Sequence, residues 1–119
     1  MALTGNFITP DGTVHPEVFA QVYPLNLQTL PGDEWAHFDV HVWHSAEAKT
    51  EGRAELMGFP RNIQLSGAAM LYKLVAIGQA FAAVAWSDDP AIAAEQAQQV
   101  IITAIEDAAM EQVPGLARA

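Results

Sequence analysis

The stretch from Trp35 to His44 alternates between small or apolar side chains and a set of tryptophan, histidine and aspartate side chains, and this period of two predicts a β-strand. Successive side chains of a strand point to opposite faces of its sheet. We expect one face to be core and the other to be the candidate site. The expected core face carries Ala36, Phe38, Val40 and Val42, and the other face carries Trp35, His37, Asp39, His41 and Trp43.

The second face supports two interpretations. Imidazole and carboxylate groups two residues apart on a strand can share a divalent metal, so His37, Asp39 and His41 are candidate ligands of a small metal module or metal enzyme. Such a site needs a further ligand from another strand, and Glu17 or Glu55 could supply it only in a fold that the sequence does not indicate. Tryptophan and histidine are typical of interface anchors, so we predict a recognition surface with no cofactor. Alternatively, Trp35 and Trp43 fold over the sheet edge and complete the core.

Residues 17–28 also alternate and predict a second strand. Pro24 interrupts it, and because proline has no amide hydrogen to donate, we expect an edge position or a bulge there. The turn sequence Leu-Pro-Gly-Asp at residues 30–33 then leads into a return strand over residues 35–45. The two segments therefore predict an antiparallel hairpin.

Residues 1–16 are predicted to be an extended N-terminal arm, with a small hairpin closed at Asp11 and Gly12 as the alternative. The start lacks both the basic segment and the apolar run of a signal peptide, which predicts a cytosolic start. Residues 17–119 are expected to form a single α+β domain.

The middle of the chain is less regular. Residues 47–53 are the most polar run and predict an exposed loop or hairpin tip, and residues 63–65 predict a short strand. The alanines of residues 68–86 favour a helix, whereas the apolar run at residues 74–77 and the break at Gly78 favour two short strands. The residues alone leave both open, and only the resemblance described below favours strands; we expect the segment to lie in a soluble core.

The clearest boundary is Ser87-Asp88-Asp89-Pro90. Three features predict a helix over about residues 90–111. They are an aspartate cap, proline at the first helical position, and negative charge at the positive end of the helix dipole. Capping explains both aspartates without a catalytic role. We therefore expect a small antiparallel sheet or sandwich with this C-terminal helix packed on it.

Composition excludes several functions. The chain has 14 acidic and 5 basic residues, a formal charge of −9 and no cysteine, so disulfides are excluded and neither nucleic acid nor an anionic membrane is an expected partner. Hydrophobic residues make up 51% and charged residues 16%, which predicts spare apolar surface and self-association. The sequence has no nucleophile elbow or phosphate-loop motif, and we predict that the protein is not an enzyme.

Three segments resemble small structural proteins of tailed bacteriophages. They are the opening MALTGNFITPDG at residues 1–12, the AWSDDP start of the final helix at residues 85–90, and the VPG tail at residues 113–115. The resemblance implies a neck, tail-tip or baseplate component that pairs with itself and with other virion proteins. It also implies a virion location after synthesis in the bacterial cytoplasm, no catalytic residues, and a strand over residues 79–86.

The histidine and aspartate pattern at His37, Asp39 and His41 departs from that family, so the metal interpretation stays open beside it. A third interpretation is a cytosolic bacterial oligomer that binds an apolar small molecule. Alanine-rich walls around residues 68–86 would then line its cavity.

Overall fold

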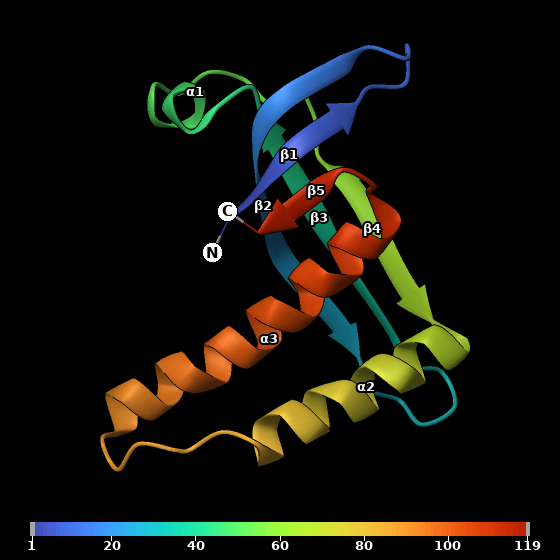
Figure 1. Cartoon of the computed structure of the whole chain (residues 1–119). Coiled ribbons are helices and arrows are strands. Elements are labelled where there is room, and N and C mark those ends of the chain that lie inside the picture. Colours follow the sequence, from blue (N-terminus) through green and yellow to red (C-terminus); the bar gives the residue numbers. More distant parts are fainter. Residues whose placement is uncertain (1, 119) are drawn as a thin grey trace.

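The computed structural model describes residues 2–118, which form a five-stranded sheet with two long helices on one side (Figure 1). The strand order is β4-β3-β2-β1-β5, and every neighbouring pair is antiparallel. The predicted α+β class, antiparallel sheet and packed C-terminal helix are thereby confirmed. The elements are β1 (Leu3–Ile8), β2 (Val14–Gln28), β3 (Trp35–Trp43), α1 (Ala46–Thr50), β4 (Arg61–Ser66), α2 (Gly67–Ala82), α3 (Pro90–Gln112) and β5 (Leu116–Arg118).

The β2–β3 hairpin forms as predicted, and its register shifts at Pro24. Val22 stands opposite Val40, but Leu25 stands opposite Phe38, so β2 holds one extra residue between these pairs. This is the bulge that proline predicts, because its missing amide hydrogen breaks the ladder. As a consequence, Leu25 faces the same side of the sheet as Val22.

The predicted N-terminal arm is wrong. Residues 3–8 are β1, an inner strand that pairs with β2 from Leu3 opposite Ala20 to Ile8 opposite Val14. Leu3 and Phe7 are fully buried in the core. A free arm would leave these two side chains in water, and pairing in the sheet removes them from it. The expected boundary at residue 17 therefore lies inside β2.

The polar run at residues 47–53 contains a short helix rather than only a loop. Ser45 caps α1, because its Oγ accepts a hydrogen bond from the amide of Ala48 at 3.1 Å. Glu47 lies in the first turn and Lys49 in the last, which suits the helix dipole. Ala48 is buried against the sheet and anchors α1 there.

The strands that the resemblance favours over residues 68–86 are also wrong, and the helix that the alanines favour is found instead. Residues 67–82 form the single helix α2, which runs through Gly78 without a break. High alanine content outweighs one glycine, which costs only about 1 kcal/mol in a helix. Met70 is the buried residue of α2, and most of its other apolar side chains are exposed. Within residues 2–118, the structure has no helix with the length and apolar content needed to cross a bilayer.

Helix α3 begins where the sequence predicts. Oδ1 of Asp89 accepts a hydrogen bond from the amide of Ala91 at 2.9 Å, and Pro90 occupies the first helical turn. The second half of α3 packs on the sheet through Ala108 and Ala109, which are fully buried. The residues after it were expected to be a tail, but residues 116–118 add β5 beside β1.

Candidate functional site

The alternation of β3 is confirmed by burial. Ala36, Phe38, Val40 and Val42 are buried in the core, whereas most of the opposite face is partly exposed. We call this opposite face the aromatic–histidine face; it consists of Trp35, His37, Asp39, His41 and Trp43. The side chains of this face contact different neighbouring residues.

Both ring nitrogens of His41 lie within hydrogen-bond distance of an oxygen atom. Its Nδ1 lies 3.1 Å from Oε1 of Glu55, and its Nε2 lies 2.7 Å from the carbonyl oxygen of Tyr23. The ring also stacks on that of Tyr23, with centroids 4.0 Å apart. Both partners are acceptors, so only the imidazolium form donates to both, and a neutral ring donates to one. Neither nitrogen points to a free position for a metal ion or a substrate.

His37 and Asp39 have different partners. The His37 ring stacks on that of Trp35 at 4.9 Å, and its Nδ1 lies 3.5 Å from Nδ2 of Asn26. Oδ1 of Asp39 accepts a hydrogen bond from Nδ2 of Asn62 at 2.9 Å. Across the part of the chain that the structure describes, no three histidine, aspartate or glutamate side chains converge as a metal-binding group. Strand spacing places the three candidates on one face without joining them into a site.

Trp43 is buried by α1, as the interpretation of a core tryptophan expects. Nζ of Lys49 lies 5.3 Å from the centroid of its ring and 5.7 Å from that of Phe19. The same ammonium group is hydrogen-bonded to Oε1 of Gln21. These contacts are cation–π and polar interactions that fix α1 on the sheet. Trp35 stays partly exposed at the other end of β3, so the two tryptophans do not form a joint surface.

Sequence reasoning named Glu55 as a possible further ligand of this face without placing it, and it missed Tyr23. The residue opposite His41 in the ladder is Gln21, so regular pairing would not indicate Tyr23 as a partner. Tyr23 contacts His41 because it lies at the β2 bulge. Glu55 follows α1 in an irregular segment, and no periodicity could have placed it beside His41. The hairpin register would have indicated one partner, since Asn26 stands opposite His37.

A second candidate surface is the hairpin of α2 and α3. Residues 64–87 contain a single charged side chain, Lys73. Tyr72 is 78% exposed and Val75 is 58% exposed, and Leu71 and Leu74 are exposed beside them. We call these four residues the outer face of α2. An exposed apolar surface of this kind is a candidate site of interaction.

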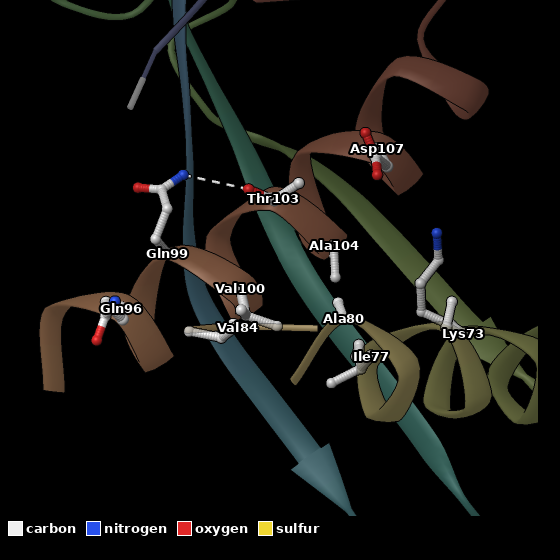
Figure 2. A pocket seen from close by; sticks show the side chains of 11 residues that line it. Lys73, Ile77, Ala80, Val84, Gln96, Gln99, Val100, Thr103, Ala104 and Asp107 are labelled. Atoms are coloured by element: carbon white, nitrogen blue, oxygen red, sulfur yellow. Dashed lines mark hydrogen bonds between the residues drawn. The ribbon is translucent and has the colours of Figure 1, made fainter. Parts of the chain in front are cut away.

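An open groove of about 350 Å³ lies between the two helices (Figure 2). Its floor is apolar and built of small and medium side chains, while Lys73 and Asp107 lie at one end and Gln96 at the other. Nε2 of Gln99 donates to Oγ1 of Thr103 at 3.1 Å along the rim. The apolar floor consists of Ala76, Ile77, Ala80, Val84, Val100 and Ala104.

The helical hairpin also gives the molecule an extended shape. The radius of gyration is 15.7 Å, whereas a compact domain of this length is expected to have about 13.5 Å. In Figure 1 the connection between α2 and α3 lies well clear of the sheet. The hairpin therefore projects from the sheet instead of packing fully on it.

Comparison of the chain with protein-family models, with curated proteins and with solved structures gave no significant match.

Proposed function

We propose that this protein is a non-enzymatic structural subunit of a larger assembly, of the kind that builds the neck, tail tip or baseplate of a tailed bacteriophage. The observation that carries the proposal is the exposed outer face of α2. Leu71, Tyr72 and Val75 are each more than half exposed on a helix with one charged residue. Full burial of one such side chain contributes about 1.5–3 kcal/mol, so this face can contribute favourably to a subunit contact.

The aromatic–histidine face supports the non-enzymatic part of the proposal. A general base needs a ring nitrogen or carboxylate within reach of a substrate. The nitrogens of His41 face Glu55 and Tyr23, and the carboxylate of Asp39 accepts from Asn62. These contacts serve to hold β2, β3, β4 and the segment after α1 together.

The virion part of the proposal rests on the short segments that resemble phage structural proteins, at residues 1–12, 85–90 and 113–115. In the structure these segments form β1 and its turn, the start of α3, and the connection to β5. A subunit with few charges and a projecting apolar hairpin fits a closed ring or a stacked assembly. Such assemblies bury the same apolar surface in every copy.

The proposal is tested by the mass of the native protein in solution. We expect light scattering to report an oligomer, and we expect the double variant Tyr72→Glu/Val75→Glu to have a smaller mass with unchanged circular dichroism. Ala46→Glu is the matched control, because it adds a charge at an exposed position of α1 on another part of the molecule. A wild-type protein that stays monomeric at high concentration would contradict the assembly function.

The virion assignment has its own test. Antibodies raised against the purified chain should label purified phage particles from the host that encodes it. Labelling of the particles supports the assignment, and its absence from intact and detergent-opened particles would contradict it. The result for oligomerisation does not depend on this outcome.

A further inference from the structure

The second half of β2 has a neighbouring strand on one edge only, and its other edge is unpaired among the described residues. The ladder between β1 and β2 ends at the pair Leu3 and Ala20, but the ladder between β2 and β3 continues to the pair Gln28 and Trp35. Among residues 2–118, no strand pairs with the other edge of β2 beyond that point. Backbone donors and acceptors along such an edge can form a ladder with another strand.

Two side chains of this edge, those of Leu25 and Leu27, are apolar and face the helix-bearing side of the sheet. Leu25 stands opposite Phe38 and Leu27 opposite Ala36, and both of these β3 residues are buried in the core. Leu25 is nevertheless 36% exposed and Leu27 is 50% exposed. They are therefore directed to the core side at a place where the described chain covers them only in part.

A groove lies beside this edge, under the helices. It has a volume of about 520 Å³ and lies between the Val22 to Leu25 part of β2 and the side chains of Phe81, Ile101 and Ile102. In Figure 1 the first half of α3 extends sideways past the strands. The helices therefore present apolar side chains beyond the edge of β2, where the described part of this chain has no strand to pack against them.

The absence of charged side chains along this edge favours a second copy of the chain as its partner. Residues 18–32 contain no charged side chain, although the chain has a net charge of −9. Two acidic copies repel each other across most of their surfaces, and this edge lets them approach without bringing like charges together. Natural edge strands avoid self-pairing by means of lysines, inward-pointing charges, prolines or bulges. Pro24 and its bulge lie just before residues 25–28, and residues 25–28 themselves have none of these features.

We propose that a second copy of this chain pairs with the uncovered edge, β2 against β2 and antiparallel, so that the two sheets become one. The proposal rests on the assembly function and names the partner and the contact. The new ladder runs along the regular part of β2 that follows the bulge, from Leu25 to Gln28. With the two-fold axis at Asn26, Leu25 pairs with Leu27 of the partner subunit, and all four leucines extend the apolar surface under the helices.

Single cysteines test the pairing, because the wild-type chain has no cysteine. Asn26→Cys should form a disulfide-linked dimer under mild oxidation, since directly opposed strand residues have Cα atoms about 4.5–5.5 Å apart. Gln64→Cys is the matched control. Asn26 and Gln64 stand on either side of His37 in the sheet, but Gln64 belongs to β4 at the far edge.

The double variant Leu25→Lys/Leu27→Lys tests the same contact without cross-linking. We expect it to halve the mass of the dimeric unit, and its thermal unfolding should remain cooperative because both positions are exposed in the single chain. Cross-linking of Asn26→Cys together with this loss of mass supports the proposal. An oligomer that neither cross-links through Asn26→Cys nor responds to the lysines overturns it, as does equal cross-linking of Gln64→Cys. Those results leave the assembly function intact, whereas a monomeric wild type contradicts both.

Discussion

Nε of Arg118 lies 3.3 Å from Oε1 of Glu106, and this pair joins the last strand to the long helix. Glu106 is buried, whereas about a third of the Arg118 side chain is exposed. The guanidinium group also donates to Oδ1 of Asp107 at 2.7 Å, and this hydrogen bond raises the pKa of Arg118. β5 is thereby fixed on α3 by charge as well as by its backbone ladder with β1.

Removal of the arginine should leave an unpaired carboxylate in the core. We expect Arg118→Ala to lower the free energy of unfolding by about 3 kcal/mol, measured by urea denaturation at neutral pH. In the double variant Arg118→Ala/Glu106→Leu the buried charge is absent, so stability should largely return. A loss in the double variant as large as in the single one would show that the arginine stabilises the fold through contacts other than its pair with Glu106.

The cap of α3 should depend on one of the two aspartates. Asp89→Ala removes the acceptor of the Ala91 amide and is expected to cost about 1 kcal/mol in chemical unfolding. Asp88→Ala is the control, and only the weaker effect of charge near the helix dipole is expected for it. Equal losses in the two variants would contradict the assignment of Asp89 as the cap.

The turn between β1 and β2 has a carboxylate with a perturbed pKa. Hydrogen bonds from the Thr9 hydroxyl and the Thr13 amide lower the pKa of Asp11 from 3.8 to about 2. The lowered pKa means that this group stabilises the fold above about pH 3.8 and that the contribution is lost as the pH falls through about 2.

An NMR titration of the Asp11 carboxyl carbon should therefore give a midpoint near 2. Thr9→Val should move the midpoint upward, toward 3.8, because it removes the largest cause of the shift. A titration that is the same in wild type and variant would show that the Thr9 hydrogen bond is absent in solution.

Gly5 should not tolerate a side chain. Its φ is +127°, and a Cβ placed on it would lie 2.1 Å from the carbonyl oxygen of Gly115. The amide of Asn6 donates to that same oxygen at 3.1 Å, so the two backbones cannot separate without loss of the β1–β5 pairing. We expect Gly5→Ala to lower the thermal midpoint strongly.

The control for Gly5 is Gly32, which also has a positive φ but no atom within 4 Å of an added Cβ. Gly32→Ala should cost only the backbone strain of a left-handed residue, about 1–2 kcal/mol. Equal stability losses in Gly5→Ala and Gly32→Ala would contradict a steric role of the close approach at Gly5.

Much of the fold could be predicted from local patterns. The alternation around Phe38 and Val40 specifies both the strand and its buried face, and Pro24 specifies an irregularity because it lacks a donor. Asp89 and Pro90 specify the helix start. In each case the decisive chemistry belongs to residues within a few positions of one another, so no distant partner is needed.

The remaining features depended on partners far away in the chain. Leu3 and Phe7 become an inner strand only because β2 and β5 lie on either side of β1, and the local sequence allows an arm equally well. Residues 68–86 have apolar side chains on every side, so periodicity could not separate helix from strand. Glu55 meets His41 because the segment after α1 returns to the sheet. Elements whose hydrogen bonds and caps are local thus follow from the amino-acid sequence. The neighbours of each strand, the carboxylate that meets His41 and the apolar surfaces that remain exposed follow from the folded arrangement, because they depend on contacts between distant segments.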